Sequence, residues 1–287
     1  MTSFHPLKTV FLSAPVQAVV AVFWIAVFMA LAEAFARALF AAGSPLVTLA
    51  LVPGALIGYY TFVRIVEHRE AAELVSPGSP KELLAGLFLG AVLMSIVVGT
   101  MHLAGAYSAN GFNPPAVMVP ALVTAVMAGT TEELLIRAAA FRILERWLGS
   151  WLALCLTAGL FGATHMPNPN ATPLSTLVIA VGGGLMLCAA YMVTRRIWFA
   201  IGIHIAWNFF QGGVFGVATS GVAVAGLLNG SLRGPIYLSG GEFGPEGSII
   251  ALIVCAAAAI ALLSYASRKG QFIRPVGGSS PRAPGDT

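Results

Sequence analysis

The sequence has few charged residues: only 9% of its 287 residues are Asp, Glu, Lys or Arg, whereas 58% are hydrophobic, and its mean hydropathy is +0.88. A soluble domain typically contains about 25% charged and about 45–50% apolar residues. This composition therefore excludes an ordinary soluble domain and predicts a polytopic membrane protein. The net charge of +4 is also too small for a nucleic-acid-binding surface, so no nucleic-acid partner is expected.

Several residue types and motifs are missing, and each absence excludes a kind of site. The only aspartate is Asp286, so a catalytic carboxylate in the apolar part of the chain must be a glutamate. Cys155, Cys188 and Cys255 lie in apolar runs without CxxC spacing, and we expect them to be small hydrophobic residues rather than disulfides or metal ligands. The sequence has no His-Glu-x-x-His, no Gly-x-Ser-Gly and no glycine-rich phosphate loop, which excludes the enzyme classes that carry those signatures.

Apolar runs that are long enough for a ~20-residue membrane span recur along the chain. They predict an all-α, polytopic integral membrane helical bundle of about eight transmembrane helices, at residues 16–40, 46–65, 83–107, 116–147, 151–166, 173–194, 197–218 and 248–267. With this even number, twelve of the fifteen Lys and Arg residues fall on the side of the two chain ends. Because basic residues favour the cytoplasmic side, we expect a multi-pass protein of the cell membrane with both termini in the cytoplasm.

The expected organisation has three parts. Residues 1–15 form a cytoplasmic N-terminus, residues 16–268 form the transmembrane bundle with a catalytic core at about 116–218, and residues 269–287 have the composition of a disordered cytoplasmic tail. The glycine-rich stretch 212–247 is long and weakly periodic, which predicts a re-entrant or lid-like segment on the far side. The charged loop at 66–80 is interpreted as an ordinary connection without chemistry.

Two adjacent glutamates and an arginine lie within the longest expected helix, which runs without Gly or Pro from Thr130 to Leu148. An ionisable group at membrane depth costs about 2.5–3.5 kcal/mol or more, so such residues usually have a function. Glu133 and Arg137 are spaced i,i+4 and can pair on one helix face. Glu132 is rotated by about 100° from that face and remains available.

Polar residues also occur on two later expected helices, as Phe161 to His165 and as the i,i+4 pair His204 and Asn208. A glutamate, two histidines and an asparagine that converge in a bundle are suited to activating water: the glutamate as general base, a histidine to hold the water, and a His/Asn pair to donate to an oxyanion. Each feature alone also has a structural interpretation, as an ion pair, a hydrogen-bonded histidine or an interhelical asparagine contact. Two other polar residues of the apolar runs, at positions 33 and 102, are assigned structural or peripheral positions.

Together these motifs resemble the CPBP family, the CAAX-processing and bacteriocin-processing (ABI) type II intramembrane endopeptidases, and in particular its bacterial members. The family pattern is Glu-Glu-x-x-x-Arg, Phe-x-x-x-His and His-x-x-x-Asn on successive helices. The chain matches all three in order, at 132–137, 161–165 and 204–208, and the resemblance covers about residues 116–218. The stretch 234–247 also looks like a segment of bacterial members, whereas Ala138 stands where many members have glycine.

The resemblance implies an eight-helix bundle with a conical cavity that opens toward the membrane and the cytoplasm. It implies an endopeptidase whose partners are the lipid bilayer and a membrane-associated or prenylated protein or peptide substrate. The catalytic residues would be Glu132 and His165, which activate water, and His204 and Asn208, which stabilise the oxyanion. The residues that support this site are Glu133, Arg137 and Phe161.

The sequence leaves the metal and the function class open. Glu132, His165 and His204 are candidate ligands for a divalent metal such as zinc, which would make the protein a metalloprotease, but their spacing matches no known zinc signature. The rival function class is a non-enzymatic membrane scaffold or bacteriocin self-immunity protein in which the same polar network is structural. A transporter is a third class, although the inverted internal repeat that would support it is not visible.

Overall fold

The computed structural model describes residues 13–75 and 77–275, and this part of the chain is almost entirely helical. The α-helices are α1 (Ala14–Leu39), α2 (Pro45–Leu49), α3 (Leu51–Ile65), α4 (Ser79–Leu103), α5 (Met118–Glu133), α6 (Arg142–Thr164), α7 (Pro173–Ile179), α8 (Leu187–Thr194), α9 (Trp198–Asn208), α10 (Ile236–Ser239) and α11 (Ile249–Arg268). Three π-helical segments continue α5, α7 and α9: η2 (Leu134–Phe141), η3 (Ala180–Met186) and η4 (Phe209–Val214). Short 3₁₀ turns are η1 (Pro115–Val117), η5 (Gly241–Phe243) and η6 (Pro245–Gly247).

Six helical stretches of the described chain are long and apolar enough to cross a membrane, at Ala14–Leu39, Pro45–Ile65, Ser79–Leu103, Pro115–Thr164, Pro173–Thr194 and Ile249–Arg268. The prediction of a multi-pass helical membrane bundle is therefore confirmed, but the number eight is not. Two of the eight expected spans are joined into the stretch Pro115–Thr164, which bends at Gly149, where φ is +76°. The seventh expected span is helical from Trp198 only as far as Val214 and is shorter than the others.

Helices α4 and α9 pack closely against each other along the bundle. Their backbones approach so closely that a Cβ atom added at Gly86 or at Gly90 would lie 2.3 Å from a carbonyl oxygen of α9. Small residues at i,i+4 allow this close helix contact in membrane proteins, where apolar burial alone gives little driving force. The contact fixes the axis of α9.

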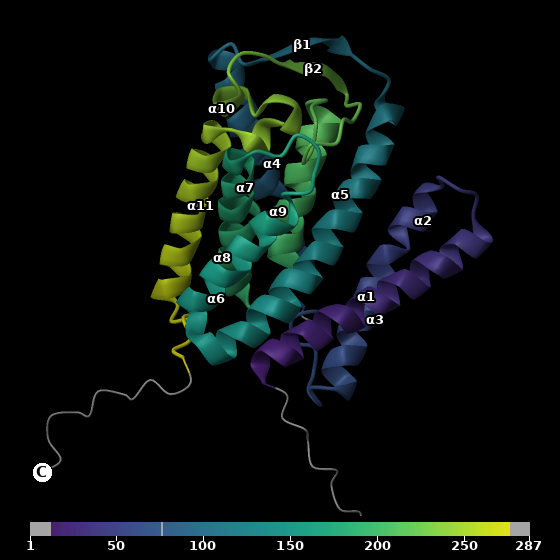
Figure 1. The fold of residues 1–287 in the computed structure, drawn as a ribbon, viewed down its shortest axis with the longest axis vertical. Coiled ribbons are helices and arrows are strands. Elements are labelled where there is room, and N and C mark those ends of the chain that lie inside the picture. The colour runs from purple at the N-terminus through teal and green to yellow at the C-terminus, as the bar shows by residue number, and fades with distance from the viewer. Residues whose placement is uncertain (1–12, 76, 276–287) are drawn as a thin grey trace, which may run out of the picture.

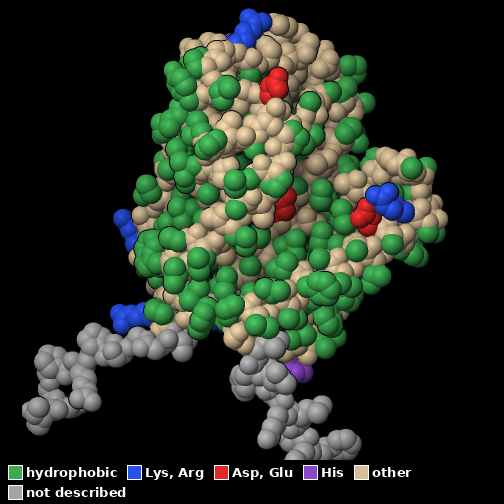
Figure 2. Space-filling view, viewed as in Figure 1, with side chains coloured by type: hydrophobic (Ala, Val, Ile, Leu, Met, Phe, Trp, Pro, Cys, Tyr) green, Lys and Arg blue, Asp and Glu red, His purple; other side chains and the backbone are tan. Residues whose placement is uncertain are grey.

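The two ends of the bundle differ. Strands β1 (Tyr107–Phe112) and β2 (Leu228–Leu232) form an antiparallel pair at one end, and α1 begins and α11 ends at the opposite end (Figure 1). Helices α1, α2 and α3 lie on one side of the bundle and α11 on the other. Hydrophobic side chains cover most of the visible face and charged side chains are few (Figure 2). This surface is suited to contact with lipid.

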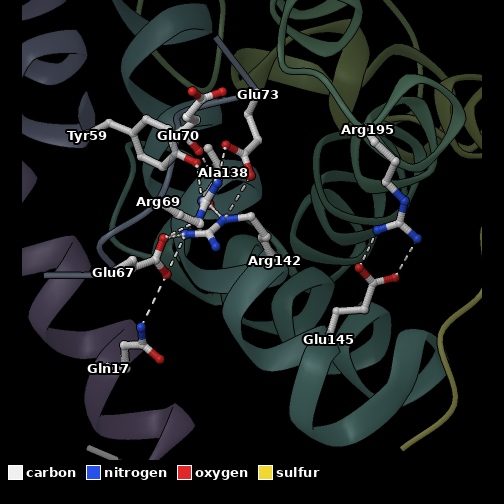
Figure 3. Close-up of polar contacts among 10 residues, drawn as sticks. All are labelled: Gln17, Tyr59, Glu67, Arg69, Glu70, Glu73, Ala138, Arg142, Glu145 and Arg195. Atoms are coloured by element: carbon white, nitrogen blue, oxygen red, sulfur yellow. Dashed lines mark hydrogen bonds and ion pairs between the residues drawn. The ribbon is translucent and has the colours of Figure 1, made fainter. Parts of the chain in front are cut away.

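The loop between α3 and α4 contains a buried ionic network that its sequence did not predict (Figure 3). Arg69 pairs with Glu67 at 2.7 Å and with Glu73 at 3.0 Å, and Arg142 of α6 pairs with Glu67 at 2.9 Å. Arg142 Nε also donates to the Ala138 carbonyl within η2 at 2.6 Å. Two arginines face two glutamates, so the network is close to neutral and ties the loop to the start of α6.

The residues after α11 turn back onto the bend at Gly149. The Ser150 backbone N–H donates to the Ile273 carbonyl at 3.0 Å, and the Ile273 N–H donates to Ser150 Oγ at 2.8 Å. Phe272 lies against Trp151, with ring centroids 4.8 Å apart. The expected disordered tail thus begins with residues that contact α6 up to position 275, and its remainder at 276–287 lies outside the described residues.

The buried network predicts a pH-dependent contribution of Glu73 to stability. Burial raises the pKa of Glu73, but the hydrogen bond from Arg69 and the charge of Arg142 outweigh it and hold this pKa below its ordinary value. A depressed pKa contributes stability above the ordinary glutamate pKa of about 4.3, and this stability is lost as the pH falls through the folded-state pKa. We expect Glu73→Gln to lower the free energy of unfolding at pH 7 by about 2 kcal/mol.

Thermal unfolding in detergent from pH 3 to 8 measures this contribution, and Glu70→Gln is the matched control because Glu70 is an exposed neighbour in the same loop. The difference between parent and Glu73→Gln should shrink at the acidic end. A difference that is independent of pH would contradict the assignment.

Candidate active site

A cavity of ≈ 300 Å³ is lined mainly by residues of α5, α6, η3 and α9. Its walls include the four predicted catalytic residues, Glu132, His165, His204 and Asn208. Of the three predicted supporting residues, Phe161 also lines the cavity, and Glu133 and Arg137 are fully buried. The folded chain thus brings residues from three separate motifs to one cavity.

Glu133 and Arg137 form the ion pair that their i,i+4 spacing predicted. Arg137 NH1 lies 2.7 Å from Glu133 Oε1, and neither side chain is exposed. Arg137 also donates to the Gly184 carbonyl at 3.3 Å, and its guanidinium lies over the Phe161 ring at 4.6 Å from the centroid. A buried charge is stable only when it is paired and hydrogen-bonded, and these contacts supply both conditions.

His204 is held by the same carboxylate, a contact that sequence reasoning missed. His204 Nδ1 lies 2.8 Å from Glu133 Oε1, so Glu133 accepts hydrogen bonds from α9 and from Arg137 together. A carboxylate that accepts from one ring nitrogen fixes the orientation of a histidine and directs the other nitrogen elsewhere. Here the other nitrogen, Nε2, lies 3.9 Å from Glu132 Oε2.

His165 follows the last residue of α6, and its ring is also fixed. Its Nδ1 lies 2.8 Å from the Phe161 carbonyl oxygen. A carbonyl only accepts, so Nδ1 carries the hydrogen and the neutral ring keeps Nε2 as a proton acceptor. The Phe161 ring lies against His165 at 4.8 Å and edge-on to His204 at 6.3 Å, which places an apolar surface between the two histidines.

Glu132 differs from its neighbour Glu133 in its exposure and its partners. Its side chain is 34% exposed and lines the cavity, whereas Glu133 is fully buried and paired with Arg137. One oxygen of each carboxylate, Oε2, is shielded from solvent and has no hydrogen-bond partner within the described residues. The partly exposed Glu132 is therefore the one of the two glutamates that a molecule in the cavity can reach.

Two of the π-helical segments directly follow site residues. Segment η2 begins after Glu133, and η4 begins after Asn208. The third, η3, supplies Gly182 and Gly183 to the cavity wall. Short π-helical stretches inside α-helices are rare and often mark functional sites, because the extra residue per turn changes which side chains share a face. No feature of the sequence predicted these π-helical segments.

The cavity also contains residues that the sequence did not single out, namely Trp207, Thr219, Ser220 and Glu246. Glu246 is 3% exposed. The sequence feature that could have indicated Glu246 is its position as a glutamate just before the apolar run of α11, in the stretch 234–247.

The two polar residues that the sequence assigned to structural or peripheral positions do not line the cavity. Glu33 forms an exposed ion pair with Arg37, and His102 contacts the Tyr107 carbonyl at 3.1 Å.

The expected zinc ligands are not arranged as a metal site. Within the residues that the structure describes, no group of three His, Cys, Asp or Glu side chains is placed to hold a metal ion. The set of Glu132, His165 and His204 therefore gains no support as a ligand set, and neither does the interpretation of the protein as a metalloprotease.

The chain matches the model of a known protein family. The model of the family described as type II CAAX prenyl endopeptidase Rce1-like matches residues 114–210, about a third of the chain. This range contains all three motifs. It supports the CPBP family prediction and points to a membrane protein that hydrolyses peptide bonds. No curated protein and no solved structure matches the chain.

The buried pair predicts a strong effect of a conservative change at Arg137. Lysine cannot contact Glu133, the Gly184 carbonyl and the Phe161 ring together, because it lacks the planar fork of arginine. We expect Arg137→Lys to reduce kcat/KM by about 10²-fold through displacement of Glu133 and His204. Peptide cleavage and thermal unfolding measure the effect.

Arg37→Lys is the matched control, because Arg37 pairs with Glu33 at the same i,i+4 spacing but on the exposed surface of α1. It should leave both measurements unchanged. Equal effects of the two substitutions would contradict a special role for the buried pair.

Proposed function

We propose that the chain is an intramembrane endopeptidase of the family described as type II CAAX prenyl endopeptidase Rce1-like, whose model matches residues 114–210. Its substrate is a membrane-associated or prenylated protein or peptide. The observation that carries the proposal is the partly exposed side chain of Glu132 in a cavity shared with two oriented histidines. A general base must lie within reach of a water molecule.

In this proposal Glu132 and His165 activate the attacking water. Glu132 takes a proton as the water oxygen attacks the carbonyl carbon of the scissile peptide bond. His165 accepts a hydrogen bond from the water through Nε2, since its Nδ1 is occupied by the Phe161 carbonyl. The proton then passes to the leaving amine, and the products are a carboxylate and an amine.

His204 and Asn208 stabilise the oxyanion in the same proposal. Both line the cavity one turn apart on α9. Because Nδ1 of His204 donates to Glu133, the ring donates to the oxyanion as an imidazolium, with a second hydrogen on Nε2. Glu133 keeps the His204 ring in place, and Arg137 holds Glu133 in position. Preorganised donors of this kind are often the largest single contribution to catalysis of acyl transfer.

The remaining lining favours an apolar substrate. Most of the cavity surface comes from hydrophobic side chains such as Met127, Ile179 and Ile203. An apolar wall beside a few polar groups is suited to a substrate segment that enters from lipid. Prenylation of that segment would add apolar surface of the same kind.

The proposal predicts that Glu132→Gln abolishes cleavage. Glutamine keeps the size of the side chain but cannot take a proton, so we expect kcat to fall by about 10²–10⁴-fold while thermal unfolding stays near that of the parent. The measurement is cleavage of a panel of prenylated and unprenylated fluorogenic peptides by the purified protein in detergent, with and without chelator.

Glu33→Gln is the control, since it makes the same change on the exposed surface of α1. A Glu132→Gln protein that cleaves as well as the parent would overturn the proposal. If no peptide is cleaved and only Glu133 and Arg137 substitutions have effects, on stability, the non-enzymatic scaffold becomes the better account.

A further inference from the structure

We infer that Glu246 is a positioning residue that fixes the turn Thr219–Val222 as one wall of the substrate cavity. This inference rests on the proposed peptidase function and adds to it a wall that contacts substrate. Glu246 lies in η6, outside the range of the family match, and none of the predicted roles involves it.

The carboxylate of Glu246 joins two segments that are distant in the sequence. It accepts hydrogen bonds from Ser220 Oγ at 2.9 Å and from the Ser220 backbone N–H, and it contacts Trp207 Nε1 at 3.3 Å. Trp207 precedes Asn208 on α9 and lies one turn from His204. One carboxylate thus ties the helix with the proposed oxyanion donors to the turn opposite them.

The turn needs such an anchor because its conformation is strained. Thr219 and Val222 exchange two backbone hydrogen bonds of 2.9 Å, and the two residues between them both have positive φ, +48° at Ser220 and +82° at Gly221. This is the pattern of a type I′ turn. Glycine adopts positive φ without cost, but serine does so only with compensation, and the two hydrogen bonds from Ser220 to Glu246 supply it.

The turn is packed on its other side as well. The Gly221 N–H donates to the Phe243 carbonyl at 2.9 Å, and a Cβ atom at Gly221 would overlap the Pro169 carbonyl in the loop that follows His165. The turn therefore lies between the segment that carries Glu246 and the loop beside one proposed catalytic histidine.

The turn forms part of the cavity wall. Thr219, Ser220 and Val222 line the cavity, as does Glu246 itself. A peptide bound in the cavity would contact this wall. Loss of the anchor would therefore weaken substrate binding, while Glu132, His165 and His204 keep their own contacts.

The test is Glu246→Gln, with Glu242→Gln as the matched control on the same segment, because Glu242 is exposed. Two readouts are used: kcat and KM for the peptides cleaved by the parent, and hydrogen exchange at residues 218–224. We expect Glu246→Gln to raise KM about tenfold with kcat within about twofold, and to speed exchange at the Ser220 amide. The control should change neither.

A second variant tests the strain directly. Ser220→Gly removes the cost of positive φ. The double variant Ser220→Gly with Glu246→Gln should therefore have a KM and an exchange rate closer to those of the parent than Glu246→Gln alone. A merely structural role of Glu246 would lower the unfolding temperature and the active fraction without changing KM, and glycine would not rescue it.

The outcomes separate the two proposals. If exchange at Ser220 is unchanged in Glu246→Gln, the anchoring role is wrong. If exchange is faster but KM is unchanged, the turn is not a substrate wall. If the parent cleaves no peptide, the peptidase proposal fails, whereas the exchange measurement still decides whether Glu246 anchors the turn.

Discussion

The site depends on one fully buried carboxylate. Glu133 accepts hydrogen bonds from Arg137 on its own helical segment and from His204 on α9, so a single anion fixes the relation between two crossings of the bundle. In a low-dielectric interior this arrangement is stable only while all three groups are present. Glu133 is held in the interior by these two contacts, and the adjacent Glu132 is the glutamate that lines the cavity. The two neighbouring glutamates differ in position because adjacent side chains of a helix point to different faces.

Much of the fold follows from the sequence because membrane helices are signalled locally. Apolar length located the helices to within a few residues, and the i,i+4 rule found the pair of Glu133 and Arg137. Hydropathy does not fix the number of membrane spans. One continuous helical stretch bends at Gly149, where φ is positive, and π-helical segments continue other helices. Neither feature changes the hydropathy of the sequence.

The sequence did not reveal the contacts between distant segments. Spacing along a helix relates His204 to Asn208, but it carries no information on the contact of His204 with Glu133, which depends on how α9 packs against α4 and α5. The ionic network of Glu67, Glu73 and Arg142 was missed for the same reason, since its partners are separated by a long stretch of chain. The contacts of Glu246 with Ser220 and Trp207 were missed for the same reason. Its carboxylate reaches the cavity only because the glycine-rich stretch folds back over it.

The most direct test of the central claim, that Glu132 activates water, is a single turnover in H₂¹⁸O with enzyme in excess over a cleaved peptide. Mass spectrometry of the product and of the enzyme fragment that carries Glu132 locates the label. Direct attack by water predicts one ¹⁸O in the new carboxylate of the product and none on Glu132. Label on Glu132 after the first turnover would show that this carboxylate attacks the substrate itself, and would contradict the account.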